Sequence, residues 1–270
     1  SDLRNPFFAD VIDGIDVAVT EAGYRAILTT GNRVPERERL AIATLLEMRV
    51  DGLILASPAL DDEFAIDASR SVPTVVVGKA TSAPTVDSVT NDDRRGAAMV
   101  VDHLVELGHR RIAHIDGGAG AGSQPRRAGY EHSMRQHGLE DEIRSTPGGF
   151  TEEGGSTGMA SLLAQDVLPT AVFVANDLAA IGALEVLDSA GRNVPGDISV
   201  VGYDNTALAA GHRMRLTTVD QPRHDMGRMA AGLILEKIEQ DRTTTSHVIL
   251  SPKLVVREST GPPHLLLRDS

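Results

Sequence analysis

The chain has 270 residues and a net charge of −12, with 41% hydrophobic and 24% charged residues. These values are typical of a globular protein long enough for two lobes, and no apolar run approaches the roughly 20 residues that span a membrane. The net negative charge argues against direct binding of this segment to the phosphate backbone of a nucleic acid, because such binding needs clustered Lys and Arg. Zero cysteines exclude disulfides, thiolate catalysis and Cys-based zinc sites, and they fit a cytoplasmic protein.

Short apolar runs alternate with segments of helical spacing along the chain. Val11, Ile15 and Val19 mark the first helical segment, and the apolar runs that follow predict strands. The expected strands are residues 25–29, 52–56, 74–78, 111–115, 171–175, 198–202 and 216–219. Continuous apolar strands suit a parallel sheet covered on both faces, and the alternation predicts right-handed crossovers. We therefore expect an α/β protein with parallel sheets flanked by helices.

Glycines mark the ends of the expected helices. Gly23, Gly108, Gly138 and Gly191 each follow a helical stripe, and glycine adopts the left-handed conformation after a helix without a steric penalty. The two halves of the chain share this rhythm, and no long Pro/Gly/Ser linker divides them. The pattern favours two similar α/β lobes joined by several crossing segments.

Polar side chains end several of the expected strands. Asn176 and Asp177 follow one strand, Asp204 follows the next, and Gln221 ends the short strand after that. Open α/β sheets bind ligands just beyond the carboxyl ends of their strands. Each residue also has a simpler explanation, because Asn and Asp cap helices and start turns.

Arg126 lies at the start of a helical segment that follows a glycine-rich loop at residues 117–122. Its five fixed donors can fork onto vicinal oxygens or a carboxylate. One of the adjacent Arg126 and Arg127 is expected to face solvent. The loop lacks the glycine spacing of a dinucleotide fingerprint, so a flexible loop over a cleft is the preferred interpretation.

Aromatic residues make up only 3% of the chain, so Phe7, Phe8 and Phe150 stand out as candidate contact surfaces. The Phe pair offers a flat platform for a sugar face or a base, with Asn5 bonding a hydroxyl. The alternative is a hydrophobic staple for the first helix, and at most one of the two adjacent rings need lie in the core. Together with the polar strand ends, these residues predict a cleft ringed by hydroxyl-binding groups and aromatic walls.

Catalytic motifs are missing from the sequence. No H-E-x-x-H or G-x-S-x-G pattern occurs, and the carboxylates of Asp61-Asp62 and of Asn91-Asp92-Asp93 resemble solvated loop or helix-start charges. Asp177 and Asp204 are the only proposed pair for a glycosidase, and nothing marks either as the acid. We expect no enzyme activity, no metal and no cofactor.

Nine fragments in this order resemble the LacI/GalR family of bacterial transcription regulators, in its effector-binding core. They are NPFF at 5–8, VDGLIL at 50–55, VPTVVVG at 72–78, HLVELGHRRI at 103–112, RRAGY at 126–130, VAND at 174–177, NVPGDISVVGYD at 193–204, LTTVDQP at 216–222 and LVVRES at 254–259. Each fragment alone is modest, but nine in order are highly specific, and they run over nearly the whole chain.

The resemblance implies a type I periplasmic-binding-protein-like fold, with the effector between two lobes joined by three crossing segments. By analogy, the N-terminal lobe comprises residues 1–90 and 221–244, and the C-terminal lobe residues 91–220 and 245–260. The family's N-terminal helix-turn-helix domain, and the apolar strand that normally precedes the first ligand loop, are absent from this sequence. The chain as it stands is therefore not expected to bind operator DNA.

The resemblance also implies a set of ligand-binding residues and a function. The set is Asn5, Phe7, Phe8, Arg126, Phe150, Asn176, Asp204 and Gln221, with Arg126 as the main anchor. This set favours a monosaccharide or small polyol, although Lys79 stands where relatives often carry a different charged contact. The implied protein is the effector-sensing core of a cytoplasmic, homodimeric LacI-type regulator, a repressor that reaches operator DNA through its missing domain. The alternative is a secreted sugar-binding receptor of a transporter.

Overall fold

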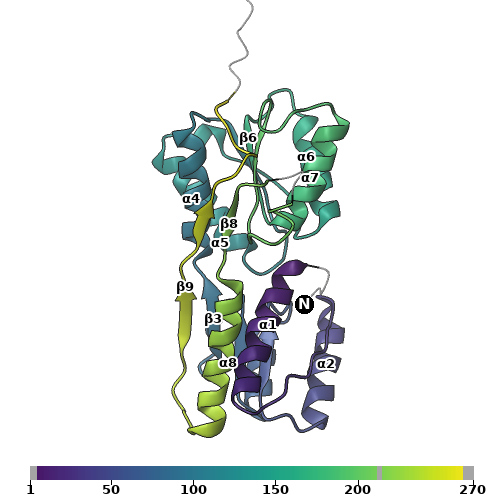
Figure 1. Ribbon diagram of the computed structural model, residues 1–270, viewed down its shortest axis with the longest axis vertical. Coiled ribbons are helices and arrows are strands. Elements are labelled where there is room, and N and C mark those ends of the chain that lie inside the picture. Colours follow the sequence, from purple (N-terminus) through teal and green to yellow (C-terminus); the bar gives the residue numbers. More distant parts are fainter. Residues whose placement is uncertain (1–4, 212–214, 264–270) are drawn as a thin grey trace, which may run out of the picture. The chain divides into compact units, whose positions relative to one another are not determined.

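The computed structural model describes residues 5–211 and 215–263, and the chain divides into two compact units (Figure 1). Unit 1 comprises Ser1–Asn91 and Pro222–Leu250, and unit 2 comprises Asp92–Gln221 and Ser251–Ser270. The C-terminal boundary falls at Leu250 rather than at the expected residue 244. The reason is that strand β9 (His247–Leu250) pairs with strand β3 (Asp87–Asn91), which places it in the sheet of unit 1.

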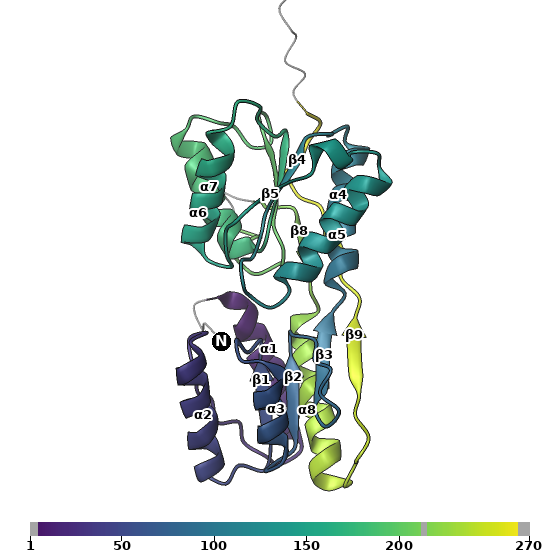
Figure 2. The ribbon, with the colours of Figure 1, turned by 180° about the vertical axis from the view of Figure 1, so that it is seen from behind.

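Unit 1 is a four-stranded parallel sheet between two layers of helices. The sheet has the order β1-β2-β3-β9, with β1 at Leu53–Ala56 and β2 at Thr74–Val77. Its helices are α1 (Pro6–Glu21), α2 (Pro35–Glu47), α3 (Asp62–Ser69) and α8 (Arg223–Glu239). Val75 and Val77 point into a cluster shared with α1 and α8, which run side by side (Figure 1), while Val76 packs toward α3 on the other face (Figure 2).

Unit 2 repeats the same architecture with its own sheet. The parallel order is β5-β4-β6-β7, and β8 and β10 form a separate antiparallel pair. The strands are β4 (Ile112–Ile115), β5 (Arg144–Thr146), β6 (Ala171–Val174), β7 (Ser199–Val201), β8 (Thr218–Asp220) and β10 (Lys253–Val255). The helices are α4 (Asp93–Glu106), α5 (Ser123–Gln136), α6 (Glu152–Leu163) and α7 (Asp177–Ser189), with a short 3₁₀ turn at Glu140–Glu142.

The strand residues of unit 2 alternate between two cores. Ile112 and Phe173 pack with α4 and α5, whereas Ala113 and Val172 pack with α6 and α7. Figures 1 and 2 show these helix pairs on opposite faces of the sheet. Both faces are buried, which explains why these strands read as continuous apolar runs, and the predicted α/β class is confirmed.

The strand expected at residues 25–29 is absent, so that prediction is wrong. Residues 24–30 carry no strand assignment, and the sheet of unit 1 ends at β1. A strand exists only through its ladder with a neighbour, and no described residue pairs with this segment. Ile27 and Leu28 are accordingly 53% and 58% exposed, although their β-prone character suggested a buried strand.

Four further strands were not predicted from the sequence. They are β3, β5, β9 and β10. β3 has the sequence DSVTN, and its polar side chains hide it from a search for apolar runs. Only pairing with its neighbours β2 and β9 fixes it as a central strand.

The glycines predicted to end helices do so. Gly23, Gly108, Gly138 and Gly191 have positive φ values of 83°, 97°, 66° and 67°. This backbone region is sterically open to glycine, so the four positions end α1, α4, α5 and α7 as expected.

A glycine contact brings α6 and α7 close together. A β-carbon on Gly155 would lie 1.8 Å from the carbonyl oxygen of Ala179. We expect Gly155→Ala to lower the free energy of unfolding by about 1–3 kcal/mol, because the two helix backbones would have to separate. Gly232→Ala is the matched control, since a β-carbon there meets nothing within 4 Å. In α8 it should stabilise by up to about 1 kcal/mol, and urea unfolding of both variants measures the contrast.

A buried carboxylate fixes the segment between α8 and β9 in unit 1. Asp87 accepts hydrogen bonds from Arg242 at 2.5 Å and from the backbone N–H of Ser246 at 2.7 Å, and the Lys237 ammonium lies 3.3 Å away. The Asp87 side chain is fully buried. Two cations and a backbone donor therefore compensate its charge.

Among the described residues, no helix is long and apolar enough to cross a membrane.

Candidate functional site

Arg126 is a buried arginine in the first turn of α5, at the end of the unit 2 sheet where the strands β4 and β6 terminate. Only 6% of its side chain is exposed. Its Nε donates to Asp93 at 3.0 Å and its Nη1 donates to the carbonyl of Ala175 at 2.5 Å. Nη1 also lies 3.8 Å from an oxygen of Asp204, and the guanidinium stacks 3.7 Å from the centre of the Tyr203 ring.

The neighbour of Arg126 behaves differently, as expected for adjacent arginines. Arg127 is 51% exposed and forms ion pairs with Asp116 and Glu131. Of the two candidates, the structure therefore assigns the buried position to Arg126. Burial alone would lower the pKa of Arg126, but Asp93, Tyr203 and Asp204 raise it, so the guanidinium is charged.

Asp93 is largely buried and paired with Arg126, so the prediction that it is a solvated charge is wrong. The sequence predicts solvated loop or helix-start charges at Asp92 and Asp93, and Asp92 does cap α4 by accepting from the N–H of Arg95 at 3.0 Å. Asp93, one residue further on, is only 12% exposed and pairs with Arg126. Spacing along the chain could not reveal this, because the pairing joins α4 to α5 across 33 residues.

Tyr203 is a second residue near Arg126 that was not among the predicted site residues. It lies just after β7, is fully buried, and its hydroxyl interacts with Asp93. A β-carbon on Gly96 would lie 2.1 Å from that hydroxyl, so α4 approaches the tyrosine closely. Burial, then the charge of Asp93, raises the pKa of Tyr203 well above its usual value, which keeps the hydroxyl protonated.

Asn176 and Asp177 are adjacent residues for which the sequence allowed either a helix cap or a ligand contact, and only Asn176 caps the helix. The side-chain oxygen of Asn176 caps α7 by accepting from the N–H of Ala179 at 2.9 Å. Its Nδ2 is buried and has no hydrogen-bond partner among the described residues. The Asp177 carboxylate instead accepts from Thr206 and Thr218, with Thr218 Oγ1 at 2.6 Å, so Asp177 organises the loops around it.

Asp204 is held in a strained backbone conformation. Its φ is 108°, a region that favours glycine, and non-glycine residues there typically mark functional sites. Gln221 donates to its Oδ1 at 2.6 Å, and both side chains are buried. The predicted site residues Arg126, Asp204 and Gln221 thus form one connected polar group in unit 2.

Phe150 lies next to this group, across the glycine-rich loop. Its ring centre is 5.2 Å from the Arg126 guanidinium. A β-carbon on Gly117 would lie 2.3 Å from the Phe150 ring, so the loop needs glycine there to admit the ring. The loop therefore serves packing in this part of the chain.

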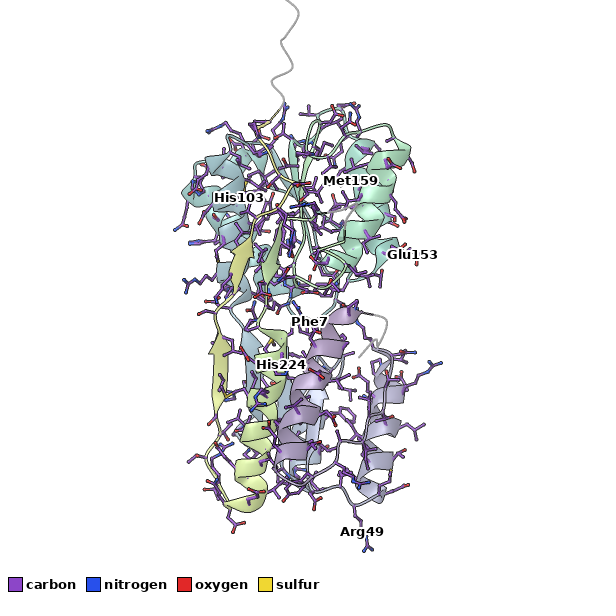
Figure 3. The ribbon with its side chains drawn as sticks, viewed as in Figure 1. Phe7, Arg49, His103, Glu153, Met159 and His224 are labelled. Atoms are coloured by element: carbon purple, nitrogen blue, oxygen red, sulfur yellow. The ribbon has the colours of Figure 1, made fainter. Side chains whose placement is uncertain are left out.

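Asn5, Phe7 and Phe8 belong to unit 1. Asn5 caps α1 by accepting from the N–H of Phe7 at 3.0 Å, and Figure 3 shows Phe7 in the first turn of that helix. The two rings meet edge to face with centres 5.1 Å apart. Both are buried in the core cluster of unit 1, so the expectation that at most one ring need be core is wrong. The helix begins at Pro6, so both rings lie in its first turn, where each is buried.

A buried histidine lies on the other side of β4 from the α6 and α7 core. His114 stacks on Phe173 with ring centres 4.5 Å apart, and its Nδ1 donates to the carbonyl of Phe173 at 2.9 Å. Its Nε2 has no partner among the described residues. Burial lowers the pKa of His114 to about 4, against smaller opposing effects of that hydrogen bond and of Asp116.

This shift predicts an acid-sensitive contribution to stability. Because the folded state favours the neutral ring, its contribution is complete above the ordinary pKa of 6.5 and is lost as the pH falls toward 4. We expect wild type to lose about 2 kcal/mol more than His114→Phe between pH 7 and pH 4.5, measured by urea unfolding. Equal losses in the two proteins would contradict the assignment.

No group of three or more potential metal ligands occurs in the part of the chain that the structure describes.

Comparisons with known proteins agree with this architecture. A family model described as a periplasmic binding protein-like domain matches residues 101–260. The HTH-type transcriptional regulator CelR of Thermobifida fusca is 37% identical over 264 residues, covering 95% of this chain and 77% of CelR. The HTH-type transcriptional repressor PurR of Klebsiella pneumoniae is 33% identical over 264 residues, covering 94% and 76%.

Solved structures give the same result. A LacI transcriptional regulator from a Rhodococcus species superposes with a TM-score of 0.92 at 39% identity, over 97% of both chains. A LacI family regulator from Enterococcus faecium with bound ribose gives 0.88 at 28% identity, over 97% of this chain and 96% of that one.

The fold and the matched domain define a periplasmic-binding-protein-like protein. Within that class, the chain belongs to the LacI family of transcriptional regulators. Its relatives are regulators and not enzymes, which agrees with the lack of catalytic motifs.

Proposed function

We propose that this chain is the effector-sensing core of a LacI-type repressor that binds a small sugar or polyol. The observation that carries the proposal is the buried Arg126, which Asp93 and the carbonyl of Ala175 hold in one orientation. Because the guanidinium is already held in one orientation, it can donate to ligand oxygens with little further loss of side-chain conformational entropy on binding. The strained Asp204 and the unpartnered Nδ2 of Asn176 add an acceptor and a donor.

A hydroxylated effector suits these groups. A sugar hydroxyl both donates and accepts, so Asp204 can accept from it while Asn176 and Arg126 donate to it. The ribose bound by the regulator from Enterococcus faecium supports a sugar of similar size. Asn5, Phe7, Phe8, Phe150 and Gln221 complete the proposed set, with Phe150 supplying an apolar wall.

Regulation requires a difference in affinity between two states. We propose that the effector binds where the two units would share it, and that it binds two arrangements of those units unequally. In a cytoplasmic homodimer this preference would change how DNA-binding domains outside this sequence meet a two-fold operator. The similarity to PurR, which is named a transcriptional repressor, supports the proposal that this protein represses transcription.

A thermal-shift screen tests the proposal. The chain is heated with neutral pentoses, hexoses, disaccharides, polyols and nucleosides, each with Arg127→Ala as a folded control that keeps Arg126. Ligand at roughly 100 times its dissociation constant should add about 2.7 kcal/mol of stability. A shift with one sugar class in both proteins supports the proposal. No shift with any sugar or polyol, from folded protein, would refute it.

A further inference from the structure

Two largely buried carboxylates lie close to the guanidinium of Arg126. Asp93 Oδ1 lies 3.0 Å from Nε of Arg126, and Asp204 Oδ1 lies 3.8 Å from Nη1. One guanidinium thus faces two carboxylates, and its positive charge is neutralised by the ion pair with Asp93. All three side chains are at most 12% exposed, so solvent and salt screen the interactions between these charges only weakly.

Two of the three guanidinium nitrogens of Arg126 already donate hydrogen bonds within unit 2. Nε is used by Asp93, and Nη1 is used by the carbonyl of Ala175. Nη2 makes no hydrogen bond to any described residue, so it is the donor left for a ligand. Arg126 therefore offers a ligand a hydrogen bond but no unneutralised positive charge.

We propose that Asp93 is a specificity-determining residue, which neutralises Arg126 and thereby restricts the site to uncharged polyhydroxylated effectors and excludes phosphate esters and carboxylates. This inference rests on the proposed function and narrows its ligand class. A sugar hydroxyl accepts from Nη2 and donates to Asp204 without a charge penalty. A phosphate at the same place can accept from Nη2, but Asp93 has already neutralised the guanidinium and the nearby carboxylate of Asp204 repels the phosphate charge.

Lys79, which stands where the sequence comparison expected a different charged contact, is engaged within unit 1. Lys79 donates to the carbonyl of Leu60 at 2.5 Å. Burial raises the pKa of Asp62, but hydrogen bonds from Ser82 and Thr81 and then the charge of Lys79 outweigh it and lower the pKa. This ammonium is therefore also engaged with acceptors of its own unit.

The chain offers a matched pair of variants. Asp93→Asn keeps an oxygen that accepts from Nε of Arg126 but removes the charge that neutralises it. Asp92→Asn makes the same chemical change one residue away, at the cap of α4, where the carboxylate bonds only the N–H of Arg95 among the described contacts. Any effect of net charge or of the helix dipole should appear in both variants, whereas a change in anion selectivity should appear only in Asp93→Asn.

The first readout uses inorganic phosphate and needs no knowledge of the effector. Thermal shift is measured against phosphate, with chloride at equal ionic strength, for wild type and both variants. We expect Asp93→Asn to bind phosphate about 10- to 100-fold more tightly than wild type and Asp92→Asn, the range that a charge-assisted hydrogen bond supplies. Equal phosphate affinity in the three proteins would overturn the inference.

The second readout compares each sugar that binds with its own phosphate ester. In wild type the ester should bind at least about tenfold more weakly than the sugar, and Asp93→Asn should reduce that ratio while Asp92→Asn preserves it. An ester that binds wild type as tightly as its sugar overturns the inference without the use of any variant. If no sugar binds, the proposed function fails, and the phosphate measurement still decides the role of Asp93.

Discussion

Replacement of Arg126 with methionine is expected to abolish effector binding and to lower the free energy of unfolding by about 3–5 kcal/mol. The substitution keeps much of the side-chain volume but leaves Asp93 and Asp204 buried without their cation. It also frees the carbonyl of Ala175 from its donor. Urea unfolding measures the stability, and calorimetric titration with the sugar found in the screen measures the binding.

Two further variants isolate the cause of this loss. Arg127→Met makes the same change at a residue that is 51% exposed, and it should alter stability by less than about 1 kcal/mol. Adding Asp93→Asn to Arg126→Met should recover part of the lost stability, because it removes the uncompensated charge. A double variant as unstable as the sum of the two single changes would show that packing, and not charge, explains the effect.

Asp87→Asn is expected to destabilise unit 1 by about 3–5 kcal/mol. The carboxylate is fully buried, and the substitution leaves Arg242 and Lys237 facing a neutral amide. Arg242 also donates to the carbonyl of Leu233 at 3.0 Å and to Ser246 Oγ at 3.3 Å, so the C-terminal half of α8 and the segment before β9 depend on the same guanidinium. Urea unfolding and hydrogen exchange of the amides in β3 and β9 measure the loss.

The control for this prediction is an exposed ion pair in the same unit. Asp67 lies 2.9 Å from Arg70, with the two side chains 57% and 75% exposed. Asp67→Asn should change the free energy of unfolding by less than about 1 kcal/mol, because exposed pairs are weakened by water and salt. Similar losses for Asp67→Asn and Asp87→Asn would contradict the argument from burial.

The sequence predicted well the features that depend on local patterns. Glycines after helical stripes ended four helices, and continuous apolar runs identified the central strands of both sheets. Asp204 and Gln221, which follow strands, and Arg126, which lies at the start of a helix, are predicted ligand contacts, and the structure connects the three in one polar group of unit 2. The family could also be recognised from ordered motifs.

The sequence failed where a residue's role depends on its partner. Residues 25–29 have the apolar pattern of a strand, but no described strand forms backbone hydrogen bonds with them. The sequence DSVTN of β3 lacks that apolar pattern, but β3 is hydrogen-bonded to neighbouring strands. Asp92 and Asp93 are chemically identical neighbours, yet one caps a helix and the other neutralises an arginine. The choice is made by the direction in which each side chain leaves α4.

By itself, then, the sequence determined the α/β class, the family and the identity of most polar residues proposed for the site, because these follow from period, composition and order along the chain. Only the tertiary structure decided the charge state and the accessibility of that site. Asp93, Tyr203 and Asp204 meet Arg126 from separate elements. The electrostatic energy of such a group depends on distance and burial in space, and neither quantity is encoded in the spacing of residues along the chain.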